Sequence, residues 1–135
     1  MYKNQTRLRT RYAETDQMGV VYYGNYPQYF EVGRVETLRT LNITYRNMEE
    51  DGIMLPVFNL EINYHKPALY DDELIIKTFV KELPNTRITF HHEIYDSREK
   101  LLTTGHVQLI FVNASTRRPM RCPQYVLDKL KPYFE

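Results

Sequence analysis

The sequence has little of what covalent catalysis and cofactor binding usually require. Only two of its 135 residues are serine, Ser97 and Ser115, and neither lies in a nucleophile-elbow motif. Its five glycines form neither a phosphate-binding loop nor a dinucleotide-binding fingerprint. We therefore expect no nucleophilic serine of the nucleophile-elbow type and no bound cofactor.

Cysteine and long apolar runs are equally scarce. The single cysteine, Cys122, cannot form an internal disulfide, and the first four residues lack the apolar core of a signal peptide. The longest purely apolar runs, such as residues 109–112, are far too short to span a bilayer. These features predict a soluble, cytoplasmic protein that does not insert into membranes.

Net charge and histidine placement argue against nucleic-acid binding and against a metal site. The formal net charge of +1 gives no argument for binding to nucleic acid. His91 and His92 are neighbours in a predicted strand, so their side chains point to opposite faces and do not readily share one metal ion. We therefore predict no metal site.

What the sequence does contain is periodic. Alternating residues predict a first strand over residues 6–14, and four more alternating runs follow Pro56, at about residues 58–64, 74–80, 88–94 and 101–113. The short connections between these four runs favour antiparallel neighbours. Shorter helices are predicted over Thr44–Asp51, before Gly52, and from Pro123 onwards.

The longest helix is predicted between Asn25 and Leu41, where apolar residues recur three and four positions apart. Gly33 lies on its apolar stripe and costs about 1 kcal/mol of helix propensity relative to alanine, which suggests a close approach to a sheet. One long helix and about five strands predict an α+β fold in which an antiparallel sheet curls around the helix. We expect residues 1–135 to form one domain.

The start of this long helix is the main candidate for chemistry. Asn25 is a favourable N-cap residue, and Gln28 completes a pattern similar to a capping box. The backbone N–H groups from about Tyr23 to Tyr26 then have no carbonyl partner, and such a helix end attracts an anion or a developing oxyanion.

Asp16 lies shortly before these N–H groups in the sequence. A thioester carbonyl oxygen bound near Tyr23 and Gly24 would allow the Asp16 carboxylate to attack the carbonyl carbon or to activate a water molecule. The alternative is that Asp16 only caps a turn. Residue types alone leave both interpretations open.

A longer motif favours the catalytic interpretation. Residues 12–26, Tyr-Ala-Glu-Thr-Asp-Gln-Met-Gly-Val-Val-Tyr-Tyr-Gly-Asn-Tyr, are followed by Tyr29-Phe30-Glu31 and Arg34. This pattern resembles the signature of hotdog-fold acyl-CoA thioesterases of the 4-hydroxybenzoyl-CoA thioesterase type, which include the Tol-Pal-associated thioesterases. The stretches 64–68 and 71–74 extend the resemblance over nearly the whole chain.

The resemblance implies a hotdog fold and a mechanism. The aspartate of the family motif, here Asp16, is the catalytic carboxylate. The backbone N–H of Tyr23, with Gly24 next to it, polarises the thioester carbonyl. Many relatives carry histidine at the position of Tyr23, whose ring here would instead shape the acyl pocket. The family assembles as dimers or tetramers with active sites between subunits, which implies a homodimer or homotetramer.

Coenzyme A requires basic residues for its phosphates and an apolar slot for pantetheine and acyl groups. Our candidates for phosphate contact are Lys66, Arg117 and Arg118, although each is also explained by a solvated charged surface. Candidates for the acyl site are Met18, Tyr22, Tyr26 and Phe58, for which core packing is an equal alternative.

The sequence therefore predicts hydrolysis of an acyl-CoA thioester to the free acid and coenzyme A, with Asp16 as nucleophile or general base. Two alternatives remain. The first is a thioesterase acting on acyl groups carried by acyl carrier protein, and the second is a non-catalytic hotdog module that binds acyl-CoA.

Overall fold

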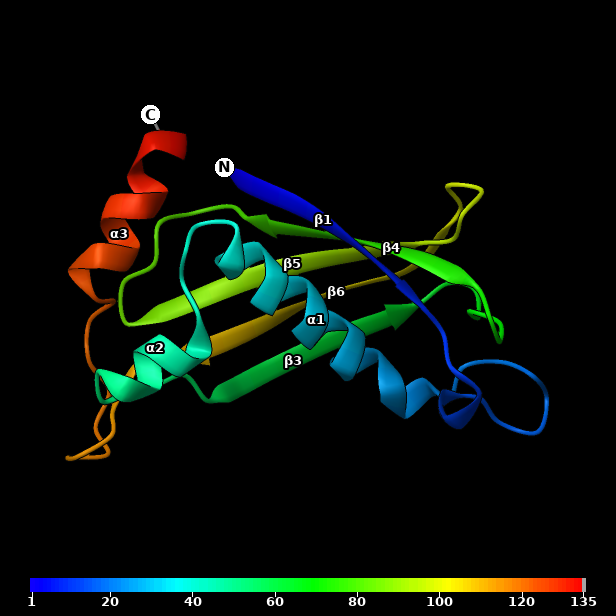
Figure 1. Ribbon diagram of the computed structural model, residues 1–135, viewed down its shortest axis with the longest axis horizontal. Helices are drawn as coiled ribbons and strands as arrows, with labels where there is room; N and C mark the ends of the chain where they lie inside the picture. The colour runs from blue at the N-terminus through cyan, green and yellow to red at the C-terminus, as the bar shows by residue number, and fades with distance from the viewer. Residues whose placement is uncertain (135) are drawn as a thin grey trace.

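The computed structural model describes residues 1–134 and is built on one five-stranded sheet (Figure 1). Its strand order is β1-β4-β5-β6-β3, and all neighbours are antiparallel. The strands are β1 (Tyr2–Arg9), β3 (Val57–Tyr64), β4 (Glu73–Val80), β5 (Arg87–Tyr95) and β6 (Leu101–Ile110). Two short strands, β2 (Ile53–Met54) and β7 (Val112–Asn113), form a separate antiparallel pair.

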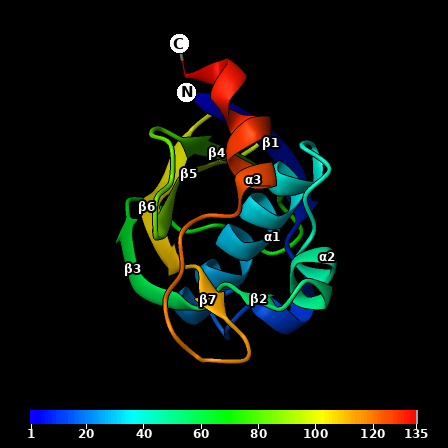
Figure 2. The same cartoon turned by 90° about the vertical axis from the view of Figure 1, so that its left-hand side faces the viewer.

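The long helix α1 (Tyr26–Arg39) lies in the hollow of this sheet. Viewed from one end, the sheet curves around α1, while the helices α2 (Tyr45–Glu50) and α3 (Gln124–Leu130) lie at its margins (Figure 2). The predicted antiparallel sheet curled around one long helix is therefore confirmed. Among the described residues, no helix combines the length and apolar character needed to cross a membrane.

Two glycines allow α1 to approach the sheet closely. A Cβ atom added to Gly33 would lie 2.7 Å from Oγ1 of Thr78 and 2.8 Å from Cγ2 of Ile76. Gly105 on β6 does the same from the side of the sheet, because a Cβ atom there would lie 2.7 Å from the Phe30 ring of α1. The close approach predicted from Gly33 is thus confirmed, and it fixes the depth at which the helix sits.

The first strand differs from its prediction. It spans Tyr2–Arg9 rather than residues 6–14, and a 3-10 turn at Tyr12–Glu14 follows it. The alternating pattern was misleading because tertiary contacts decide this segment. Thr10 N–H donates to the Asp72 carbonyl, and the Glu14 carboxylate accepts hydrogen bonds from Arg11.

The helix boundaries show one correction and two confirmations. Asn25 does not cap α1 with its side chain, so the predicted capping box is wrong; its amide Nδ2 instead donates to the Glu14 carbonyl. The predicted second helix is confirmed as α2, where the Thr44 hydroxyl accepts a hydrogen bond from Asn47 N–H. The helix predicted from Pro123 is confirmed as α3.

His92 is buried between α1 and the sheet. Its ring stacks on Phe30 with centroids 4.6 Å apart, and Nδ1 shares a 3.0 Å hydrogen bond with the Thr78 hydroxyl. Burial lowers the pKa of His92 to about 3, and the positive charge of Arg34 acts in the same direction. His92 is therefore neutral in the folded protein at physiological pH.

The Gly33 contacts predict that Gly33→Ala destabilises the protein although alanine favours helices. Overpacking costs about 1–3 kcal/mol, which exceeds the helix-propensity gain of about 1 kcal/mol. Urea unfolding would measure the change, with Gln28→Ala on the exposed side of α1 as the control. A stabilised Gly33→Ala variant would contradict the close packing.

The buried state of His92 predicts acid sensitivity. Its folded pKa lies below its unfolded value, so below about pH 6.5 the unfolded chain binds a proton that the folded chain does not. The free energy of unfolding should therefore fall by up to about 1.4 kcal/mol per pH unit between pH 6 and 4 from this group. Urea unfolding across that range should show a smaller slope in His92→Gln than in His65→Gln, and equal slopes would refute it.

Candidate active site

The Asp16 loop, residues 16–21, is a tight turn closed by its own backbone. Asp16 N–H donates to the Val20 carbonyl at 2.9 Å, and Gly19 N–H donates to the Asp16 carbonyl at 3.1 Å. Gly19 has φ +77°, a conformation that favours glycine. The Asp16 atom Oδ1 accepts the Met18 N–H at 2.8 Å.

Asp16 therefore does cap a turn, but the cap uses only one of the two oxygens of its carboxylate. Within residues 1–134 its second oxygen, Oδ2, has no hydrogen-bond partner, and the side chain lines a groove. The turn fixes one oxygen and thereby orients the other. An exposed, oriented carboxylate of this kind can act as a base or as a nucleophile.

The loop is fastened to the connection between β3 and β4. Val21 N–H donates to the Ala68 carbonyl at 2.8 Å, and Tyr70 N–H donates to the Gly19 carbonyl at 3.0 Å. These bonds place residues 16–21 beside residues 67–70, far along the sequence. The position of Asp16 is thus set by the β3–β4 connection as well as by its own turn.

A buried carboxylate, Glu14, holds the loop against α1. It accepts hydrogen bonds from the Tyr29 hydroxyl at 2.8 Å and from the backbone N–H of Arg11 at 2.8 Å. Burial alone would raise the pKa of Glu14, but these bonds and the Arg11 guanidinium outweigh it and lower the pKa. Glu14 is therefore an ionised carboxylate with a structural role, and it contacts α1 rather than the groove.

The first N–H groups of the helical segment are a second feature of the candidate site. A 3-10 turn, Tyr23–Asn25, runs directly into α1. Tyr22 N–H donates to the Glu14 carbonyl and Asn25 N–H to the Tyr22 carbonyl, both at 2.9 Å. No hydrogen bond is made by the N–H of Tyr23 or Gly24 to any residue from 1 to 134. Two unpaired donors at a helix N-terminus are suited to an oxyanion.

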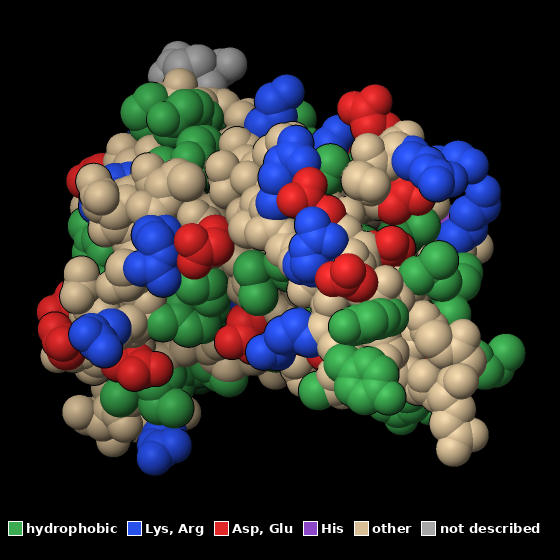
Figure 3. Space-filling model, turned by 45° about the vertical axis from the view of Figure 1, so that its right-hand side comes forward, with side chains coloured by type: hydrophobic (Ala, Val, Ile, Leu, Met, Phe, Trp, Pro, Cys, Tyr) green, Lys and Arg blue, Asp and Glu red, His purple; other side chains and the backbone are tan. Residues whose placement is uncertain are grey.

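A groove of about 380 Å³ adjoins this helix end. It is lined by Asp16, Val20, Val21, Tyr23, Tyr26, Tyr64, His65, Lys66 and Pro67. Exposed hydrophobic side chains gather at this end of the molecule, which the turned view brings forward (Figure 3). The groove thus combines a carboxylate, aromatic walls and one lysine.

The structure brings together some of the residues predicted from the sequence. Asp16, Tyr23, Tyr26 and Lys66 all line the groove, and Gly24 follows Tyr23 in the same 3-10 turn. Tyr26 is only 2% exposed, so its side chain belongs to the core as well as to the lining of the groove.

Other predicted residues lie outside the groove. Met18 is 85% exposed, and the Tyr22 ring packs against the Tyr23 ring with centroids 4.6 Å apart. Phe58 lies near the start of β3, under the Arg87 guanidinium, whereas the groove adjoins the end of that strand. These three side chains line no part of the groove within one copy of the chain.

The two predicted arginines are more distant. Arg117 and Arg118 lie in the turn after β7, at the opposite end of the molecule from the Asp16 loop (Figure 1). β3 alone runs eight residues between these ends, which corresponds to roughly 26 Å. The two arginines therefore lie outside the Asp16 groove, and their contact with coenzyme A remains a prediction.

Tyr64 and His65 were not among the predicted site residues. Tyr64 ends β3 and His65 follows it, and both reach the groove because β3 pairs with β6, so their role depends on strand pairing that a local pattern does not reveal. The available signal was the 64–68 stretch, part of the family resemblance.

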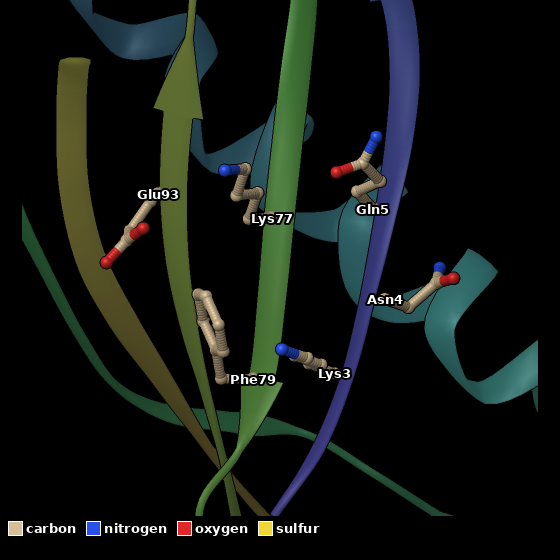
Figure 4. A pocket seen from close by; sticks show the side chains of 6 residues that line it. All are labelled: Lys3, Asn4, Gln5, Lys77, Phe79 and Glu93. Atoms are coloured by element: carbon tan, nitrogen blue, oxygen red, sulfur yellow. The ribbon is translucent and has the colours of Figure 1, made fainter. Parts of the chain in front are cut away.

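A second groove of about 370 Å³ lies on the outer face of the sheet, across β1, β4 and β5 (Figure 4). Its carboxylate, Glu93, accepts a hydrogen bond from the Tyr95 hydroxyl, and its Lys77 lies over the Tyr95 ring. These charged groups are already engaged, and the lining contains no helix N-terminus. The Asp16 groove is therefore the better candidate.

Metal and thiol chemistry find no support in the described chain. Residues 1–134 contain no group of three or more histidine, cysteine, aspartate or glutamate side chains that could hold a metal ion. Burial raises the pKa of the Cys122 thiol to about 12, which keeps it protonated.

Comparisons with known proteins agree with this geometry. A family model described as the thioesterase-like superfamily matches residues 10–130. The chain is 31% identical to the putative acyl-CoA thioesterase YneP of Bacillus subtilis, over 90% of this chain and 88% of the relative. It is 33% identical to the acyl-CoA thioesterase YbgC of Haemophilus influenzae, over 88% of both.

Among solved structures, the DHNA-CoA thioesterase from Staphylococcus aureus superposes with a TM-score of 0.90 at 38% identity, over 98% of this chain and 89% of that one. The family match covers most of the chain, and the superposition covers nearly all of it. The chain therefore belongs to the thioesterase-like superfamily and has the hotdog fold of its members.

Proposed function

We propose that this chain, an acyl-CoA thioesterase, cleaves its substrate in the Asp16 groove. The observation that carries the proposal is the placement of the Asp16 carboxylate and the unpaired N–H groups of Tyr23 and Gly24 around one end of α1. The family and the relatives named as acyl-CoA thioesterases support the reaction class. We treat residues 1–135 as one hotdog domain.

In the proposed reaction the thioester carbonyl oxygen accepts hydrogen bonds from Tyr23 N–H and Gly24 N–H. Charge that develops on this oxygen is stabilised by these donors and by the helix dipole, and one oxyanion donor typically contributes about 10²–10³ in rate. The same groups interact less with the neutral carbonyl of the ground state, so they favour the transition state.

Two routes are open to the Asp16 carboxylate. As a general base it removes a proton from water, whose oxygen attacks the carbonyl carbon, and the C–S bond breaks as the coenzyme A thiolate leaves and takes up a proton. As a nucleophile it attacks the carbon itself, expels the thiolate and forms a mixed anhydride that water then hydrolyses. A single turnover in H₂¹⁸O tests the second route: ¹⁸O enters Asp16 when water attacks the Asp16 carbonyl of the anhydride, whereas the first route leaves Asp16 unlabelled.

We propose an aromatic acyl group for the substrate. The groove walls include the rings of Tyr23, Tyr26 and Tyr64, and Tyr26 meets Tyr64 edge to face with centroids 5.2 Å apart. Such walls favour a flat ring by aromatic packing. The DHNA-CoA thioesterase of S. aureus, which this chain resembles, is a further argument for an aryl substrate. Lys66 in the lining is our candidate for phosphate contact.

We also propose that the protein works in the cytoplasm as a homodimer or homotetramer. β3 is an edge strand, and its hydrophobic residues Val57, Phe58, Leu60 and Tyr64 are 41–50% exposed. An exposed apolar edge offers unpaired backbone groups to another strand. A second copy paired along β3 would adjoin the groove at Tyr64 and bring further side chains to it.

The mechanism predicts that Asp16→Asn lowers kcat about 10²-fold or more, because the amide can still accept the Met18 N–H but cannot take a proton or attack. Thiol release from short, medium, long and aromatic acyl-CoAs would measure this, with Asp128→Asn as the matched control. Full activity of Asp16→Asn would contradict the mechanism.

The same assay separates the alternatives. Turnover of an acyl group only when it is carried by acyl carrier protein would favour the carrier-protein thioesterase. Stoichiometric binding of acyl-CoA without release of thiol would favour the non-catalytic module.

The proposed subunit contact predicts that Leu60→Lys weakens assembly, because it places a charge in an apolar contact. Analytical ultracentrifugation should show a smaller particle for this variant than for the wild type, and kcat/KM should fall with it. Leu83→Lys, in the exposed β4–β5 connection, should change neither. A wild-type particle in Leu60→Lys would argue against the β3 contact.

A further inference from the structure

Tyr64, the last residue of β3, links this strand to the start of the helical segment. Its hydroxyl donates to the Tyr23 carbonyl at 2.9 Å, across 41 residues of sequence. Its ring packs edge to face against both Tyr26 and Tyr23, with centroids 5.2 and 6.5 Å apart. The hydroxyl is therefore held in place by two aromatic contacts.

Pro27 deprives the Tyr23 carbonyl of its α-helical partner. In an α-helix the carbonyl of residue 23 would accept the N–H of residue 27, but proline has no N–H. The first turn thus leaves an acceptor without its α-helical partner, and the Tyr64 hydroxyl supplies a donor from the sheet.

The Tyr23 carbonyl and the Gly24 N–H belong to the same peptide group. This group is planar and trans, so the carbonyl and the N–H point in opposite directions and cannot rotate independently. Fixing the carbonyl therefore fixes the direction of the Gly24 N–H. A carbonyl that accepts a hydrogen bond also polarises its peptide and strengthens the N–H as a donor.

Glycine at position 24 makes such an external restraint valuable. Gly24 has no side chain of its own to restrict the peptide, and a Cβ there would lie 2.5 Å from the Tyr22 ring. The Tyr64 hydroxyl remains protonated at neutral pH, since burial and the neighbouring Tyr23 raise its pKa. The restraint is thus present throughout the neutral range.

We infer that Tyr64 is a positioning residue, whose hydroxyl fixes the peptide between Tyr23 and Gly24 so that the Gly24 N–H is preorganised to bind the thioester oxyanion. The inference rests on the proposed function of the groove. It adds a specific role for the edge strand in the chemistry.

Tyr64→Phe tests this role because it removes only the hydroxyl and keeps the ring. Loss of one hydrogen bond of about 0.5–1.5 kcal/mol should lower kcat roughly 3- to 10-fold. KM should stay within about twofold, since the ring that lines the groove is retained. The melting temperature should fall by no more than a few degrees, because only one hydrogen bond at an exposed site is lost.

Tyr2→Phe is the matched control, since the Tyr2 hydroxyl shares a 2.5 Å hydrogen bond with the Thr40 hydroxyl elsewhere in the chain. It should leave kcat unchanged. A raised KM with normal kcat in Tyr64→Phe would mean that the hydroxyl contacts substrate directly, and wild-type kinetics would mean that it does neither; both overturn the inference. If Asp16→Asn is also fully active, the proposed function fails as well, whereas an inactive Asp16→Asn leaves that function standing.

Discussion

Two backbone N–H groups without internal partners are the feature on which the rest of the site depends. A helix start must leave such donors somewhere, and here those of Tyr23 and Gly24 lie beside a groove rather than under a capping side chain. Asn25, which would be a natural cap, is turned away to the Glu14 carbonyl. The helix end therefore stays available for the oxygen of a substrate.

The surrounding structure holds these donors and the Asp16 carboxylate in register. Glu14 ties the loop to α1 through Tyr29, and the backbone bonds to Ala68 and Tyr70 tie it to the connection between β3 and β4. Gly33 lets α1 sit close to β4, so the helix that carries the donors is itself set at one depth. In the proposed mechanism such preorganisation lowers the cost of reaching the transition state, because the donors need not move.

The sequence was informative where local pattern decides the structure. The apolar stripe of α1 and the Asp16 motif identified the helix, its exposed end and the carboxylate. It was less informative where strand pairing decides. Whether Tyr64 or Phe58 adjoins the groove depends on which end of β3 meets α1, and the distance of Arg117 from Asp16 depends on the same pairing. The β1 boundary was wrong because Thr10 hydrogen-bonds to a residue 62 positions away.

The most direct test of the central claim is an NMR titration of ¹⁵N-labelled protein with an aromatic acyl-CoA analogue that keeps the carbonyl but replaces the sulfur with a methylene group. We expect the amide proton resonances of Tyr23 and Gly24 to move downfield as they bind the carbonyl oxygen, and more than those of neighbouring residues. Saturable binding that leaves both resonances unmoved would contradict the account, because the carbonyl would then lie elsewhere.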